Sequence, residues 1–289
     1  MPLRPQHLLL ALSLATGCRT VVPRAAPAAP SAVQVTVRSP GVEFTLSTSR
    51  ADAGEVGRLG SSLLAAIGEV ARWGSLRGSV EVRVLEDHAA LERVLSRPGH
   101  PWLRAWAYAD LVLLQSPRTW EATFQPRDLL ELLAHELTHV LMYQQLEPDD
   151  GPPSWLTGVQ PEEPPLWFRE GMASVTAGQG QKRLSPLELR GWLDSHPGKN
   201  PLDPDPELVR TEKEAVYSAA HRAFERLLER GGDQPVRDVL RGMRAGARFG
   251  DAFAAATGQQ LAAFERDALR AGFATGAKAP KAIEGAGGP

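Results

Sequence analysis

Alternating apolar and polar residues dominate the first part of the chain and predict strands that are buried on one face. Two of these runs flank Ser39-Pro40-Gly41, a turn signal that predicts a hairpin. Apolar residues at helical spacing lie between the strand patterns. The strands are expected over residues 33–37, 42–46, 79–85 and 108–114, and the helices over 51–72 and 88–95. Residues 33–125 are therefore predicted to form a mixed α/β half.

The strand pattern ends near residue 126, and the remaining chain has the pattern of a series of helices to about residue 272. The first of them covers residues 128–145 and is largely apolar. Asp128 is expected to cap it, with Glu131 as the second member of a capping box. The predicted fold class is α+β, with an N-terminal mixed α/β sheet half, a mostly helical C-terminal half over residues 126–273, and the helix 128–145 between them.

The first seventeen residues have the composition of a signal peptide. Arg4 precedes an apolar run that is too short to span a bilayer. The run ends in Thr16 and Gly17 before Cys18, and this sequence resembles the lipobox of bacterial lipoproteins. The resemblance implies a lipid on Cys18 that anchors the protein to a membrane outside the cytoplasm. Because Arg19 and not Asp follows, the outer membrane is favoured over the inner one. The alternative is an ordinary secretory signal followed by a free cysteine.

The segments next to the two ends are poor in core-forming residues. Residues 18–32 are rich in Ala and Pro, which indicates an extended tether. Residues 274–289 are rich in Gly, Ala and Pro, and we expect a disordered tail there. The folded domain is accordingly placed at residues 33–273.

Composition narrows the functional classes. Apolar residues make up 43% of the 289 residues and charged residues 23%, as in globular proteins. The chain has 32 Lys and Arg against 34 Asp and Glu, a net charge of −2, and no basic run. Nucleic acid is therefore excluded as the main partner. Cys18 is the only cysteine, which excludes a disulfide framework and a zinc site with several cysteines.

The helix 128–145 carries the sequence His135-Glu136-Leu137-Thr138-His139, an instance of H-E-x-x-H. Two histidines four positions apart lie one above the other on one face of a helix, so that both imidazoles can bind one Zn²⁺. Glu136 lies beside them, where it can take a proton from water on the metal. Three titratable groups in an apolar helix need partners, which favours a metal site over two structural histidines and a surface glutamate.

A catalytic zinc usually has a third protein ligand. Metzincins provide a histidine six residues after the second one, but position 145 is Gln145, so that class is excluded. The alternative is a glutamate from a following helix. Pro164 and Pro165 predict the start of such a helix, and Glu170 lies one turn inside it.

These two segments, HELTH and residues 167–174 (WFREGMAS), resemble the gluzincins. These are the thermolysin-like and aminopeptidase-like zinc peptidases, whose third ligand is a glutamate in a W-x-x-E-G-x-A context. The resemblance implies that His135, His139 and Glu170 bind Zn²⁺ and that Glu136 is the general base. It also implies a thermolysin/aminopeptidase-like zincin fold.

The resemblance covers about residues 105–230 and is specific at the two helices. It implies an edge strand before the zinc helix, at residues 107–114, to which the substrate backbone adds as a further strand. Two family features are missing. No G-x-M-E-N motif is present, so the sequence does not support specificity for a free amino terminus. Ser174 stands where thermolysin has an aspartate that orients a zinc ligand, so another group must hold His135.

Residues 215–232 are similar to a helix of the bacterial peptidase MA-like branch, which has an early tyrosine and a closing glycine. Tyr217 then can donate a hydrogen bond to the oxyanion of a tetrahedral intermediate. The alternative is a core tyrosine whose hydroxyl is satisfied within the protein. His221, one turn later, is expected to be structural.

The sequence therefore favours a lipid-anchored zinc peptidase that cuts peptide or protein substrates with water activated by Glu136. One alternative is a binding or scaffolding module on the same fold, with little or no catalysis. Another is a hydrolase for a non-protein amide such as a cell-wall peptide. The intact Glu136 argues against the binding module, because a structural zinc site has no need of a general base.

Overall fold

A computed structural model describes residues 33–121, 124–147 and 162–271. The expected signal peptide, Cys18, the tether and the tail lie outside the described residues. The strands are β1 (Val33–Ser39), β2 (Val42–Thr48), β3 (Gly78–Leu85), β4 (Ala105–Tyr108) and β5 (Leu111–Gln115). The helices of the first half are α1 (Val56–Val70) and α2 (His88–Leu95), followed by α3 (Pro126–Leu146). The later helices are α5 (Leu166–Thr176), α6 (Pro186–Ser195), α7 (Pro206–Thr211), α8 (Lys213–Gly231), α9 (Gln234–Arg244), α10 (Phe249–Thr257) and α11 (Leu261–Ala271).

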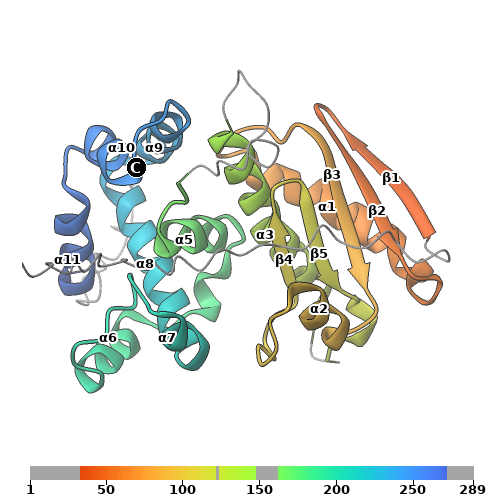
Figure 1. Cartoon of the computed structure of the whole chain (residues 1–289), viewed down its shortest axis with the longest axis horizontal. Helices are drawn as coiled ribbons and strands as arrows, with labels where there is room; N and C mark the ends of the chain where they lie inside the picture. Colours follow the sequence, from red (N-terminus) through yellow and green to blue (C-terminus); the bar gives the residue numbers. More distant parts are fainter. Residues whose placement is uncertain (1–32, 122–123, 148–161, 272–289) are drawn as a thin grey trace, which may run out of the picture.

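The chain has a sheet half and a helical half, with α3 between them (Figure 1). This confirms the predicted mixed α/β half at the N-terminus and the helical half that follows. On one side α3 packs against α1, β4 and β5, and on the other it packs against α5 and α9. Within the described residues, no helix is long and apolar enough to cross a membrane.

The five strands form one sheet in the order β1-β2-β3-β5-β4. β2, β3 and β5 run parallel, with Phe44 opposite Val80 and Val82 opposite Val112, while β1 and β4 pair antiparallel with their single neighbours. The side chains of Val80, Val82 and Val84 point to the same buried face, as their alternation predicted. The expected hairpin over residues 33–46 is confirmed as β1 and β2.

The single strand expected over residues 108–114 is wrong. The chain turns at Ala109 and Asp110, and the segment belongs to two antiparallel strands, β4 and β5. Ala109 has a φ of 50°, which an alanine adopts only when its surroundings impose it. Because the turn contains neither Gly nor Asn, the sequence carries no signal for it. The edge strand is therefore β4, and it shares only residues 107 and 108 with the edge strand that the resemblance implied at residues 107–114.

The start of α3 also differs from the prediction. The helix begins at Pro126, and Asp128 lies in its first turn instead of capping it. The carboxylate of Asp128 accepts a hydrogen bond from the backbone N–H of Gln125 at 2.6 Å, which is the reciprocal half of a capping box. Glu131 takes no part in the cap and pairs with Arg127 and Lys182.

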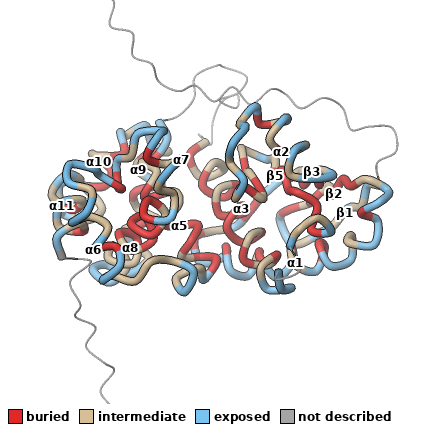
Figure 2. Tube along the Cα trace, turned by 90° about the horizontal axis from the view of Figure 1, so that it is seen from below, coloured by how far each residue is buried: buried red, intermediate tan, exposed pale blue. Residues whose placement is uncertain are grey.

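A continuous apolar core joins the two halves (Figure 2). Trp73, which follows α1, lies edge-on to Phe224 of α8 with ring centroids 5.8 Å apart. Phe224 in turn lies edge-on to Phe168 of α5 at 5.5 Å. The Trp73 indole N–H donates to Thr176 Oγ1 at the end of α5, at 2.6 Å. The sheet half thus fixes the position of α5 directly.

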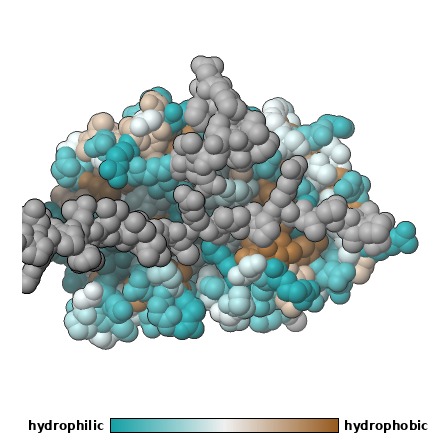
Figure 3. Space-filling view, in the orientation of Figure 1, coloured by the Kyte–Doolittle hydropathy of each residue, from teal (hydrophilic) through white to brown (hydrophobic). Residues whose placement is uncertain are grey.

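A smaller apolar cluster lies between α2 and the sheet, around the fully buried side chains of Leu91 and Leu113. Partly buried neighbours such as Trp102 and Trp106 border this cluster. An apolar area is visible over β4 and β5 on a surface that is otherwise mostly hydrophilic (Figure 3). The aromatic residues next to β4 therefore lie between a packed cluster and the surface.

The close approach of α5 and α8 depends on Gly171. A Cβ atom at this position would lie 2.5 Å from the carbonyl oxygen of Ala220 and 2.6 Å from Cβ of Phe224. Gly171→Ala is therefore expected to force the helices apart and to lower the free energy of unfolding by about 1–3 kcal/mol. Urea denaturation measures this loss. Gly68→Ala in α1 is the matched control, since nothing lies within 4 Å of its Cβ, and it is expected to stabilise the protein by about 0.4–1 kcal/mol. Equal stability of the Gly171 and Gly68 variants would contradict this account of the α5–α8 contact.

Candidate metal centre

His135, Glu136 and His139 lie on the side of α3 that faces β4 and α5. The helix is held in place by its other faces, on which the apolar residues Leu133 and Leu137 are fully buried. The side chains of His135 and Glu136 are also largely buried, with 9% and 6% of their surface exposed. The polar residues in this apolar helix therefore lie inside the protein, as the sequence indicated.

Helix α5 brings Glu170 to the two histidines. Its start after Pro165 agrees with the prediction, and Glu170 lies on the second turn. Glu170 Oε2 lies 3.2 Å from His135 Nε2, and Glu170 Oε1 lies 3.8 Å from His139 Nε2. The two Nε2 atoms are 3.3 Å apart. The three side chains thus meet although Glu170 is 31 residues after His139.

This donor set fits zinc in chemistry and in spacing. Two imidazole nitrogens and one carboxylate oxygen are a common ligand set of catalytic zinc sites. Ligand atoms about 2.1 Å from a tetrahedral ion lie about 3.4 Å apart. The separations between the donor atoms of His135, His139 and Glu170 are close to that value, and all three residues are grouped within 4.8 Å.

Glu136 lies beside the three donors and under the edge strand. The pKa of its carboxyl is raised to about 7, mainly because burial disfavours the charged form, and the charge of Glu170 contributes to this rise. His135 and the backbone N–H of Ala107 in β4 lower this pKa, because both stabilise the carboxylate. Glu136 is therefore a buried carboxyl that the surroundings hold between its protonated and ionised forms, as general bases require.

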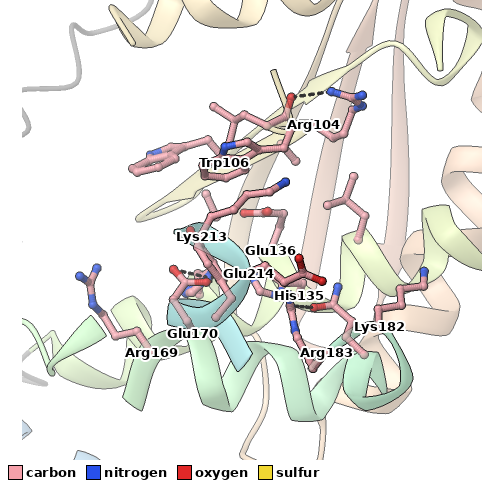
Figure 4. A pocket seen from close by; sticks show the side chains of 18 of the residues that line it. Arg104, Trp106, His135, Glu136, Arg169, Glu170, Lys182, Arg183, Lys213 and Glu214 are labelled. Carbon is pink, nitrogen blue, oxygen red and sulfur yellow. Dashed lines mark hydrogen bonds and ion pairs between the residues drawn. The ribbon is translucent and has the colours of Figure 1, made fainter. Parts of the chain in front are cut away.

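A cleft of about 450 Å³ opens onto these residues (Figure 4). β4 and the residues before it form one wall, and α3, α5 and α8 form the others. Within the described part of the chain, β4 pairs with β5 alone, so its other edge is free. The cleft thus places an open strand edge next to Glu136 and the candidate metal ligands.

Tyr217 of α8 lines the same cleft. Its ring lies edge-on to Trp102 at 5.9 Å, and the guanidinium of Arg183 lies 5.7 Å from its ring centroid. Burial raises the pKa of the Tyr217 hydroxyl well above its ordinary value, and so does the charge of Glu170. The hydroxyl accordingly stays protonated and forms no hydrogen bond with a described residue, which leaves it available as a donor in the cleft.

Ser174 has a different role from the aspartate that it replaces. Its Oγ lies 2.9 Å from His221 Nδ1 and accepts a hydrogen bond from Arg183 Nε at 3.1 Å. It does not contact His135, whose buried Nδ1 has no hydrogen-bond partner among the described residues. The group that we expected to hold His135 is thus not found in the described part of the chain. His221 is 2% exposed and lies between Ser174 and Glu225, and its expected structural role stays a prediction.

Sequence reasoning missed several charged residues of the cleft. Arg183 follows the short 3-10 helix η3 (Gln179–Lys182), and Lys213 and Glu214 lie at the start of α8. No motif marks Arg183. Lys213 lies four residues before Tyr217, so helical spacing alone could have placed the two on one face.

Comparison with known proteins gives only distant likenesses. No protein-family model and no curated protein matches the chain. Among solved structures, aminopeptidase A from Legionella pneumophila in complex with aspartic acid is 16% identical, with a TM-score of 0.49, over 82% of this chain and 28% of that one. An M1 zinc metallopeptidase from Deinococcus radiodurans is 13% identical, with a TM-score of 0.40, over 84% and 51%. An aminopeptidase N family protein from Idiomarina loihiensis is 14% identical, with a TM-score of 0.39, over 82% and 46%. The chain thus spans about a quarter to a half of the length of these proteins.

Proposed function

We propose that this protein is a zinc-dependent peptidase of the gluzincin type. The observation that carries the proposal is the convergence of His135, His139 and Glu170 from two helices, at separations that suit one zinc ion, with Glu136 beside them. A zinc ion held by these three residues would supply a Lewis acid for the scissile carbonyl and would make water a nucleophile at neutral pH.

The chain's own residues supply the remaining chemistry. Glu136 accepts the proton of the attacking water on its carboxylate and then passes it to the amine that leaves. The free edge of β4 binds the substrate backbone as an added strand and holds the scissile bond over Glu136. The Tyr217 hydroxyl donates a hydrogen bond to the oxygen that becomes negative in the transition state.

Metal stoichiometry tests the proposal first. Elemental analysis of the full-length protein is expected to give one zinc per chain, and His139→Ala is expected to lose it. Retention of zinc in His139→Ala, or no zinc in the wild type after reconstitution at neutral pH, would reject the site. A wild-type protein that binds no zinc after reconstitution would favour the alternative of a binding module on this fold.

Tyr217→Phe tests the oxyanion donor. The substitution removes one hydroxyl and keeps the ring that packs against Trp102. We expect kcat to fall by roughly 10²-fold, since loss of one such donor typically costs that much, with unchanged zinc content. Steady-state kinetics on a peptide substrate measures the change. A kcat within about twofold of the wild type would return Tyr217 to a packing role.

The location of the peptidase is part of the same proposal and rests on residues 1–18 alone. We propose a lipid on Cys18 and a position outside the cytoplasm. Mass spectrometry of the mature N-terminal peptide decides between this and a cleaved secretory signal.

A further inference from the structure

The cleft is lined by cations that form no ion pair, among the described residues, with the carboxylates of its own lining. Five cationic side chains line it, against three carboxylates. Two of the cations already have acidic partners: Lys182 Nζ lies 2.6 Å from Glu131 Oε2, and Arg169 Nη1 lies 2.9 Å from Glu163 Oε2. A third, Arg104, donates to main-chain carbonyl groups. Among the described residues, the remaining two cations have neither an acidic partner nor a main-chain carbonyl as acceptor.

These two are Arg183 and Lys213, and neither forms an ion pair with a described residue. The ammonium group of Lys213 lies 4.9 Å from the ring centroid of Trp102. Burial lowers the pKa of both groups, and the charges of Arg104 and Arg183 lower that of Lys213 further. Glu170 and Glu214 raise the pKa of Arg183, and Glu214 raises that of Lys213, but neither carboxylate forms an ion pair with either cation. Partly buried cations without acidic partners are costly unless a ligand completes them.

A chain of polar contacts holds Arg183 in place. Its Nε donates to Ser174 Oγ, and its Nη2 donates to Gln179 Oε1 at 2.7 Å. Ser174 is fully buried and bonds His221, whose Nε2 lies 3.3 Å from Glu225 Oε1. The Nη1 group remains without a described hydrogen-bond partner. The guanidinium is thus fixed on one side and open on the other.

The side chains of Lys213, Glu214 and Glu136 extend into the same pocket (Figure 4). Arg183 lines this pocket too, and the charge of Glu170, a candidate metal ligand, raises the pKa of the Arg183 guanidinium. Both cations therefore lie in the cleft that the substrate would occupy. A planar guanidinium with free N–H groups is well suited to bind a carboxylate, and an ammonium group adds charge from another direction.

We propose that Arg183 and Lys213 form a carboxylate-binding subsite in the cleft. This rests on the proposed peptidase function and names its substrate class, namely peptides that carry a carboxylate close to the bond that is cut. The carboxylate is either an acidic side chain or a free C-terminus.

Three families of acetylated alanine peptides distinguish these sources. Peptides of the first family have a free C-terminal carboxylate, and those of the second have a C-terminal amide. Peptides of the third family also have the amide, and in each of them one alanine, at a different position, is replaced by glutamate. With the zinc-loaded full-length protein, we expect kcat/KM to be about tenfold to a hundredfold higher for one or both carboxylate families than for the neutral amide. Equal cleavage of all three families overturns the subsite and leaves the peptidase proposal intact.

Substitutions assign the preference to residues. In Arg183→Gln and in Lys213→Gln, the ratio of kcat/KM for acidic over neutral peptides is expected to fall to about one. Arg183→Lys keeps the charge but loses the planar fork, so its ratio is expected to be intermediate. Lys182→Gln is the matched control, because it removes a cation of the cleft that Glu131 already neutralises, and its ratio is expected to match the wild type. A wild-type ratio in both Gln variants at Arg183 and Lys213 overturns the assignment.

Binding gives a readout that does not need turnover. Calorimetry with Glu136→Gln is expected to show tighter binding of the acidic peptides than of the amide, and the difference is expected to disappear when Arg183→Gln is added. If the wild type cuts nothing but this difference is present, the subsite stands and the peptidase proposal fails. If no peptide binds, or all bind equally, the subsite is wrong. Thermal melting of each variant identifies any that do not fold. If Arg183→Gln does not fold, the test is made with Arg183→Lys and Lys213→Gln.

Discussion

Glu136→Gln is expected to lower kcat by roughly 10²–10⁴-fold while the protein keeps its zinc. The substitution preserves the size of the side chain and its place between Ala107 and the candidate metal ligands, but an amide cannot accept the proton of the attacking water. Removal of a buried carboxyl beside Glu170 also relieves repulsion, so the fold is expected to be at least as stable. Steady-state kinetics and elemental analysis on the same sample measure both properties.

Glu131→Gln is the matched control for this experiment. Glu131 is a largely buried carboxyl on the same helix, but it pairs with Arg127 and Lys182 and does not line the cleft. Its loss is expected to reduce stability and to leave kcat within about threefold. Full activity in Glu136→Gln would reject Glu136 as the general base.

Glu170→Gln is expected to weaken zinc binding by more than the roughly 10–100-fold that changes outside the ligand set cost. The amide has nearly the same shape, so packing of α5 is retained, but the negative charge that faces both imidazoles is lost. Competition with a chromogenic chelator measures the affinity. Because zinc stabilises only the folded protein, at about 2.7 kcal/mol for a free concentration 100-fold above Kd, the rise in Tm on adding zinc is expected to disappear at concentrations where the wild type shows it.

Glu163→Gln is the corresponding control. It removes a carboxylate near the same helix that pairs with Arg169 and lies outside the group of metal ligands. Its zinc affinity is expected to equal that of the wild type. Equal zinc affinity in Glu170→Gln and the wild type would show that another residue completes the site.

Local sequence signals predicted most elements of the fold, and the resemblance to the gluzincins pointed to the three candidate ligands that the fold brings together. Period-two patterns gave β1, β2 and β3, and the H-E-x-x-H spacing placed His135 and His139 on one helix face. Pro164 and Pro165 gave the start of α5, and that start put Glu170 in the correct turn. These features depend on neighbours within one or two turns, so that the sequence contains the information that determines them.

The features that sequence reasoning missed depend on distant neighbours. The β4–β5 turn is imposed on Ala109 by the strand pairing and not by a turn residue. Arg183 and Lys213 belong to different elements, and only the folded chain brings them to the lining of one cleft. Ser174 could be recognised as a departure from the family, but its bond to His221 needed the tertiary structure.

The direct packing of α5 on α3 has a consequence for how related sequences are to be sought. Trp73 and the shared core fix α5 relative to α3, so the geometry of His139 and Glu170 does not depend on the length of the chain that connects them. In general, a change in the length of a chain that joins two packed helices costs little, since loop-closure entropy changes slowly with length. A search pattern for such sites therefore needs two short motifs, each matched strictly, with the gap between them left open.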